Sequence, residues 1–150
     1  MQIRDAQPSD GPGFLELVQC LADYENLPGP TAEAKERLLD HAFGPEPKFR
    51  LLVAIEDSRV VAYAAWFVTY STFRARPTLF LEDLLVHPEM RRQGLGTAMM
   101  QELRLRALAM KAGRFEWTVL DWNEDAQALY EGLGAKRLEG WQIMRIDLPD

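Results

Sequence analysis

Residues 86–97, VHPEMRRQGLGT, place two arginines and two glycines between an apolar run and a long helical pattern. The first backbone N–H groups of a helix lack partners within it, so a helix that starts here would attract an anion. Gly94 and Gly96 let a ligand approach the backbone closely, and they permit positive φ. Arg91 and Arg92 add positive charge beside the helix dipole. These features predict a pyrophosphate site, and the alternative is an ordinary glycine-containing turn with two solvated arginines.

Two common nucleotide-binding loops do not match this segment. It lacks the Gly-Lys-Ser/Thr ending of a P-loop, and its Gly-Leu-Gly sequence lacks the third glycine of a dinucleotide-binding fingerprint. Neither motif therefore explains the turn.

Two acidic residues and a tyrosine are the other candidates for chemistry. Glu82 and Asp83 are neighbours in a predicted strand, so their side chains are expected on opposite faces, and at most one of them would enter a given site. A carboxylate pair of this kind also suits a structural role, which would be to neutralise Arg91 or Arg92. Tyr130 lies in a short predicted helix, where its phenol is either a proton donor or an ordinary core aromatic.

The elements that position these residues follow from hydrophobic periodicity and from cap residues. Asp57 and Ser58 separate two β-branched and aromatic runs, which is typical of a tight hairpin. The predicted strands cover residues 2–6, 49–56, 59–70, 78–86, 114–122 and 141–147, and the predicted helices cover residues 10–25, 32–43, 95–112 and 123–134. This order, without internal repeats or a second linker, predicts one α/β domain over residues 1–150 around a mixed sheet.

The composition of the chain narrows the classes of molecule that it is expected to bind. The chain has 23 acidic against 17 basic residues and a formal charge of -6, which argues against nucleic acid or an anionic membrane and suits a cationic small molecule. Cys20 is the single cysteine, so no disulfide framework and no metal-ligand cluster are expected, and Cys20 itself is expected in packing. His41 and His87 are expected as ordinary polar residues. Because no signal peptide or membrane span is evident, we expect a cytoplasmic protein.

The glycine-rich turn and its surroundings resemble a known family. VHPEMRRQGLGTAMM (86–100) after LFLEDLL (79–85) is similar to the Arg-x-x-Gly-x-Gly motif of the GNAT superfamily of N-acetyltransferases. LADYE, YST, VLDWNEDAQALYEGLGA and EGW resemble one branch, the diamine and thialysine N-acetyltransferases. The resemblance covers nearly the whole chain. It implies an α/β (α+β) fold with a mixed, mostly antiparallel central sheet of about six to seven strands, flanked by about four helices.

The resemblance also implies roles for individual residues. Glu82 would accept the proton of the substrate amine, directly or through water, and Tyr130 would be the general acid for the departing thiolate. The strand at residues 84–86 would bulge away from its neighbour, although the same residues suit a buried strand end. The cosubstrate acetyl-coenzyme A would contact Leu84, Leu85, Val86, Arg91, Arg92, Gln93, Gly94, Leu95, Gly96, Thr97, Asn123, Ala126 and Tyr130. The amine would contact Tyr24, Glu25, Glu82, Asp83, Glu139 and Trp141, and no metal is implied.

The substrate is a small amine whose identity is open. Spermidine-type enzymes have an Asp and a Trp where this chain has Ser71 and Phe73, and Arg74 and Arg76 follow nearby. Extra cations disfavour a long polycation, and an arginine could receive the α-carboxylate of an amino acid. A thialysine-like ω-amino acid is therefore the leading expectation, with small diamines second. The alternatives are polyamine acetylation, acetylation of a protein lysine or N-terminus, and a catalytically silent coenzyme A-binding regulatory domain. The resemblance further implies a homodimer that completes each site across its interface.

Overall fold

The computed structural model describes all 150 residues. It divides the chain into two units, residues 1–118 and residues 119–150. Each unit is described by itself below.

The first unit contains a five-stranded sheet in the order β1-β2-β3-β4-β5. Neighbouring strands run antiparallel except for β4 and β5, which are parallel. The sheet is therefore mixed and mostly antiparallel, as expected. The strands are β1 (Gln2–Asp5), β2 (Arg50–Glu56), β3 (Arg59–Ser71), β4 (Arg76–Val86) and β5 (Arg114–Trp117).

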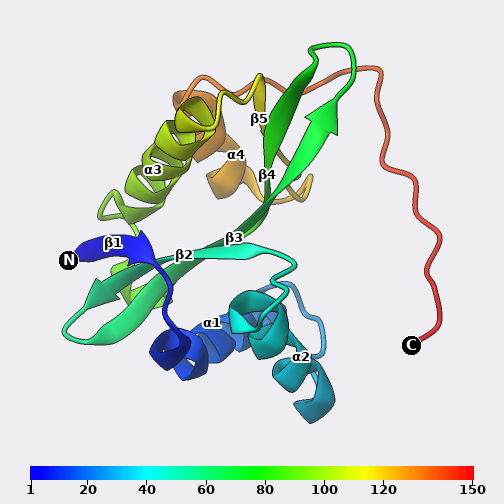
Figure 1. Cartoon of the computed structure of the whole chain (residues 1–150). Helices are drawn as coiled ribbons and strands as arrows, with labels where there is room; N and C mark the ends of the chain where they lie inside the picture. Colours follow the sequence, from blue (N-terminus) through cyan, green and yellow to red (C-terminus); the bar gives the residue numbers. More distant parts are fainter. The chain divides into compact units, whose positions relative to one another are not determined.

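Helices cover both faces of this sheet (Figure 1). Leu51 and Val53 pack in one core cluster with Phe14 and Leu17 of α1, whereas Leu52 points the other way and is also fully buried. Since alternate strand residues face opposite sides, α1 and α2 cover one face of the sheet and α3 the other. The helices of this unit are α1 (Gly11–Tyr24), α2 (Ala32–Phe43) and α3 (Leu95–Ala109), with short 3-10 turns η1 (Pro8–Asp10) and η2 (Pro88–Met90).

The local signals for turns and caps are confirmed at two places. Asp57 and Ser58 have φ of 48° and 62°, and they connect β2 directly to β3. Positive φ at both central residues is the geometry of a tight hairpin turn. Thr31 caps α2, because its side-chain oxygen accepts a hydrogen bond from the N–H of Ala34 at 3.1 Å.

A bulge interrupts the pairing of β3 with β4. Ala65 pairs with Asp83, but the next residue, Trp66, pairs with Leu81, so Glu82 is the extra residue. Residues that pair across two strands point to the same face of the sheet, so Asp83 lies on the face of Ala65, which α1 covers. Glu82 points to the opposite face from its neighbour Leu81, and it therefore lies on this face as well. The expectation of opposite faces was therefore wrong, because the alternation breaks at this residue. The family resemblance had placed the bulge at residues 84–86, whereas the structure has it just before them, at Glu82.

Beyond the bulge, β4 and β5 part. Their parallel pairing runs from Thr78 and Arg114 to Leu81 and Trp117, where β5 ends. Residues 82–86 of β4 pair with β3 alone, so their outward N–H and C=O groups have no strand partner on the β5 side. The expected strand 114–122 is accordingly shorter than its sequence pattern indicated.

The second unit contains α4 (Glu124–Gly132). Asn123 caps it, because the side-chain oxygen accepts from the N–H of Ala126 at 3.2 Å. The strand expected at residues 141–147 does not form, and its apolar residues stand exposed, Trp141 by 79%. An alternating pattern shows that a segment suits a sheet, but a strand forms only when a neighbour satisfies its backbone groups. The chain thus has five strands instead of the expected six or more, and the expected four helices.

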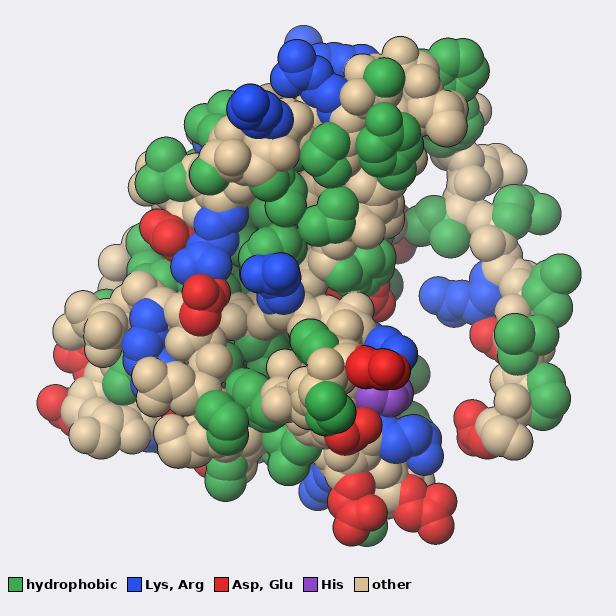
Figure 2. Space-filling view, in the orientation of Figure 1, with side chains coloured by type: hydrophobic (Ala, Val, Ile, Leu, Met, Phe, Trp, Pro, Cys, Tyr) green, Lys and Arg blue, Asp and Glu red, His purple; other side chains and the backbone are tan.

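No helix is long and apolar enough to cross a membrane. Over α2, acidic and basic side chains lie next to one another (Figure 2), so this helix presents no surface of a single charge.

Candidate functional site

The start of α3 has free donors and no side-chain cap. Its cap residue, Gly94, has φ of +79°, a left-handed conformation that suits glycine, and no side chain bonds to the first N–H groups. A Cβ built on Gly94 would meet nothing within 4 Å, so the space in front of this helix end is open. A 15-residue helix that begins in this way presents its dipole and its backbone donors to an anion.

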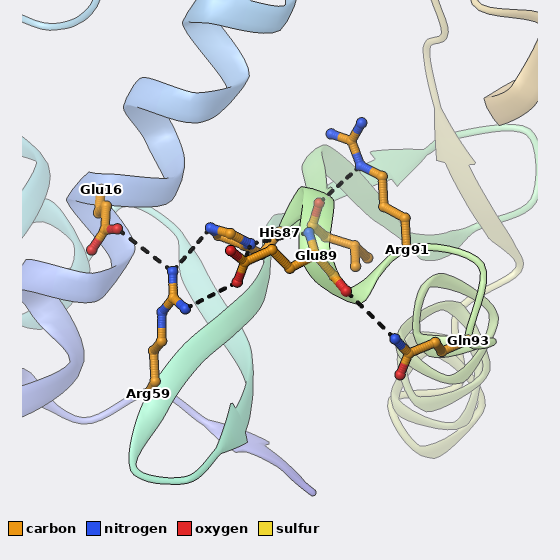
Figure 3. A network of polar contacts seen from close by, with 7 residues as sticks. Glu16, Arg59, His87, Glu89, Arg91 and Gln93 are labelled. Carbon is orange, nitrogen blue, oxygen red and sulfur yellow. Dashed lines mark hydrogen bonds and ion pairs between the residues drawn. The ribbon is translucent and has the colours of Figure 1, made fainter.

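A polar network holds the turn that leads to this helix (Figure 3). Arg59, at the start of β3, lies 3.9 Å from Glu16 of α1 and 3.4 Å from Glu89 of η2. Its Nη2 also lies 3.0 Å from Nε2 of His87, whose Nδ1 faces the N–H of Glu89 at 3.2 Å. A neutral imidazole has one acceptor nitrogen and satisfies one of these two donors at a time. The network connects three segments and thereby positions the loop before α3.

The two arginines of the motif differ in their surroundings. The Nε of Arg91 donates to the backbone oxygen of Val86 at 3.2 Å, and its guanidinium lies 5.4 Å from the ring centre of Tyr24. Arg91 is therefore directed toward the end of α1 and is not simply solvated. Arg92 is exposed and has φ of 63°, which is uncommon for a residue with a side chain.

Two carboxylates act on a third, that of Asp83, at the bulge. Burial raises the pKa of Asp83 to about 6, with further contributions from the negative charges of Glu82 and Glu25. Glu25 follows directly after α1, and Glu82 is exposed beside Asp83. No group of His, Cys, Asp or Glu in the chain could hold a metal ion. The cluster offers concentrated negative charge, which suits an organic cation such as an ammonium group.

The second unit carries the remaining predicted residues. Asn123 and Ala126 form the cap of α4, and one turn further on, burial raises the pKa of the Tyr130 phenol. A phenol with a raised pKa keeps its proton at neutral pH, as a proton donor must. Glu139 and Trp141 are exposed in a segment without helix or strand.

In the first unit the structure thus brings together Glu25, Glu82 and Asp83, and it places Arg91 over Tyr24, the residue before Glu25. Sequence reasoning missed Arg59, which lies 28 residues before its partner His87. It also missed Tyr63, which lies in an otherwise apolar run. No local signal identified either residue, because both act through partners that are distant in sequence. Cys20 packs beside the α1 core cluster, as expected.

The model of the acetyltransferase (GNAT) family matches residues 14–135. The chain is similar to thialysine N-epsilon-acetyltransferase of Sus scrofa, with 35% identity over 97% of this chain and 91% of that protein. It is 30% identical to L-ornithine N5-acetyltransferase of Arabidopsis thaliana over 61% of this chain and 40% of that protein. A crystal structure of a probable acetyltransferase has a TM-score of 0.87 at 18% identity, over 100% of this chain and 99% of that one. The chain therefore belongs to the GNAT family and is an N-acetyltransferase.

Proposed function

We propose that this protein transfers the acetyl group of acetyl-coenzyme A to the primary amine of a small cationic substrate in a ternary complex. The observation that carries the proposal is the β4–α3 segment. In it an acidic bulge at Glu82 and Asp83, a strand edge without a partner and an uncapped helix start at Gly94 follow one another within 13 residues. These three features supply contacts for an ammonium group, for an acyl carbonyl with its amide-containing arm, and for a pyrophosphate.

The start of α3 fits the pyrophosphate. Gly94 leaves open space where another residue would place a Cβ, and residues 95–97 begin the helix with unpaired N–H donors. Arg92 is exposed beside them, whereas Arg91 is held at Val86 and Tyr24. We therefore assign the direct charge contact to Arg92 and the ordering of the loop to Arg91.

The strand edge suits the acyl arm. The backbone groups of residues 84–86 that point away from β3 have no strand partner, although the Val86 oxygen accepts from Arg91, and pantetheine carries amides that pair with such groups. Acetyl-coenzyme A supplies an activated thioester. The amine nitrogen forms a bond to the acyl carbon, and the carbon–sulfur bond breaks.

The protons of this reaction need an acceptor and a donor. Alkyl ammonium groups have a pKa near about 10.4, so the amine must lose a proton before it attacks. Glu82 and Asp83 lie on one face, where either can take that proton directly or through water. Tyr130, a phenol that holds its proton at neutral pH, is the proposed donor to the thiolate that leaves. Because the family model spans residues 14–135, we propose that both units belong to one catalytic domain.

The amine is proposed to be a thialysine-like ω-amino acid, with small diamines second. The names of the pig and Arabidopsis relatives support an ω-amino acid. The sequence suggested that an arginine such as Arg74 or Arg76 could receive its carboxylate, but both lie toward the far end of the hairpin from the bulge. Arg76 precedes Glu82 by six residues of strand, roughly 20 Å between the two backbones at about 3.3 Å each.

The carboxylate contact is instead assigned to Arg91, which lies over Tyr24, the neighbour of Glu25. At the distant end of the hairpin, the Oγ of Ser71 accepts from the N–H of Arg74 at 3.1 Å, and Phe73 is 97% exposed. These residues lie at the far end of β3 and β4 from the bulge. A role across a homodimer interface, with Glu139 and Trp141, is part of the proposal.

Thiol release from acetyl-coenzyme A tests the function. Purified protein is assayed with thialysine, lysine, ornithine, putrescine, spermidine and a lysine peptide, and mass spectrometry identifies the acetylated product. The proposal expects release that depends on the amine and is fastest with an ω-amino acid. A clear preference for spermidine or for the peptide would overturn the substrate class. Tight binding of acetyl-coenzyme A without release by any amine would instead favour a regulatory domain.

A further inference from the structure

Tyr63 is a buried tyrosine that none of the roles above includes. It lies in β3 with 0% of its surface exposed, and its ring meets Phe14 of α1 edge-on, with the ring centres 5.1 Å apart. In the sheet it pairs with Leu85. The ring is therefore held between the sheet and α1, where a phenylalanine would fill the same space.

The hydroxyl of Tyr63 is the unusual feature. Its oxygen is buried and makes no hydrogen bond of normal geometry in the structure. A buried polar group without a partner costs free energy that a phenylalanine would not incur. Packing alone therefore does not explain why a tyrosine occupies this position.

The hydroxyl faces the acidic bulge. Asp83 pairs with Ala65, two residues from Tyr63 on the same face of the sheet, which makes the two residues diagonal neighbours. The groups that act on Tyr63 are Asp83 of β4, Glu25 after α1 and Cys20 of α1. Glu82 and Glu25 are the other charges that act on Asp83. None of these groups is basic, so none of them pairs with the Asp83 carboxylate as a cation. The Tyr63 hydroxyl is a nearby hydrogen-bond donor that is available to it.

We propose that Tyr63 is a positioning residue of the amine site, whose hydroxyl donates a hydrogen bond to ionised Asp83 and orients this carboxylate toward the substrate ammonium. This inference rests on the proposed amine acetylation. The bound ammonium favours the ionised carboxylate, so the hydrogen bond strengthens when substrate binds. In the free protein the hydroxyl lies close enough to act on Asp83 without a hydrogen bond of normal geometry, and the amine complex tightens this contact.

The proposal predicts a change in pH dependence. A donor to a carboxylate favours its charged form, and contact with the Tyr63 hydroxyl lowers the pKa of Asp83 against the larger effects that raise it. Removal of the hydroxyl therefore raises the pKa of Asp83. The acid limb of kcat/KM for the amine then moves to higher pH, and the loss is larger at about pH 6 than at about pH 8.5.

The experiment compares Tyr63→Phe with Tyr70→Phe. Tyr70 lies in the same strand, is 64% exposed and serves as the matched control. Carbon-13 NMR of the side-chain carboxyl follows the titration of Asp83 without substrates, and kinetics measure KM for the amine and for acetyl-coenzyme A. Near pH 6 we expect the Tyr63 variant to raise the KM for the amine about tenfold, the effect of one lost hydrogen bond to a charged group. We expect an upward shift of the Asp83 midpoint, an unchanged KM for acetyl-coenzyme A and an unfolding temperature that is not lowered.

Two results would overturn the proposal. One is an unchanged Asp83 midpoint together with unchanged amine kinetics in Tyr63→Phe. The other is a lower unfolding temperature with kinetic losses equal at all pH values, which would indicate a structural role. If wild-type protein acetylates no amine, the proposed function fails, and the NMR titration still decides whether Tyr63 acts on Asp83.

Discussion

Replacement of Asp83 by Asn is expected to stabilise the protein at alkaline pH while it weakens amine acetylation. Burial and the charges of Glu82 and Glu25 raise the pKa of Asp83 to about 6. In an unfolded chain an aspartic acid titrates near about 3.9. The difference, at about 1.36 kcal/mol for each pH unit, corresponds to on the order of 3 kcal/mol that ionised Asp83 costs the folded state. Asparagine removes this cost and keeps the shape of the side chain.

The stability gain of Asp83→Asn over wild type must grow as the pH rises. Below about pH 4 both the folded and the unfolded chain hold the proton, so the raised pKa costs the wild type nothing. As the pH rises through about 6, the unfolded chain has already ionised and the folded chain follows, so wild-type stability falls. The advantage of the Asn variant therefore grows between about pH 4 and pH 6 and is complete above that range.

Urea unfolding at about pH 5 and about pH 8 measures this advantage. We expect the gain of Asp83→Asn over wild type to be larger at the higher pH by on the order of 1 kcal/mol. Asp57→Asn is the control, because Asp57 lies exposed in the hairpin turn, where a surface substitution changes stability by about 0.5 kcal/mol or less. A gain of the same size at both pH values, or no gain at about pH 8, would refute the electrostatic reasoning.

Two further predictions concern the candidate site, and a third concerns the fold of the first unit. Gly94→Ala is expected to cost about 1–2 kcal/mol of stability, because Gly94 has φ of +79°, and to weaken acetyl-coenzyme A binding tenfold or more in calorimetry. Gly134→Ala has similar backbone strain, with φ of +91°, and should leave binding unchanged; equal losses of binding would contradict the role of the α3 start. Tyr130→Phe is expected to lower kcat by about 10²-fold or more with unchanged KM for acetyl-coenzyme A, and an unaltered kcat would remove Tyr130 from acid catalysis. Asp10→Asn is expected to destabilise the fold by about 2–3 kcal/mol in urea unfolding, because buried Asp10 bonds to Arg4 at 2.7 and 3.1 Å and to the N–H of Gln7 at 2.7 Å. These bonds hold the pKa of Asp10 below its usual range, so their stabilisation is present above about pH 4 and is lost as the pH falls further; an Asp10→Asn deficit that persists in acid would contradict this account.

The sequence by itself determined the elements whose signals are local. Periodic apolar residues predicted all four α-helices. Cap residues placed the start of α2 at Thr31 and that of α4 at Asn123, and two turn residues predicted the connection of β2 to β3. The apolar stripe that begins at Leu95 placed the start of α3. Such signals succeed because a helix or a tight turn is formed by residues that are neighbours in the chain. The family resemblance rested on these same segments, and the comparisons confirmed it.

Only the tertiary structure decided how distant segments meet. The shift of one residue between β3 and β4 placed Glu82 and Asp83 on one face, and no alternation in either strand predicts such a shift. The same register set Tyr63 beside Asp83. A strand-like pattern at residues 141–147 produced no strand, because the ladder also requires a partner. Periodicity reports which side of a segment is apolar, whereas register, pairing and raised pKa values depend on contacts between residues that are far apart in the chain.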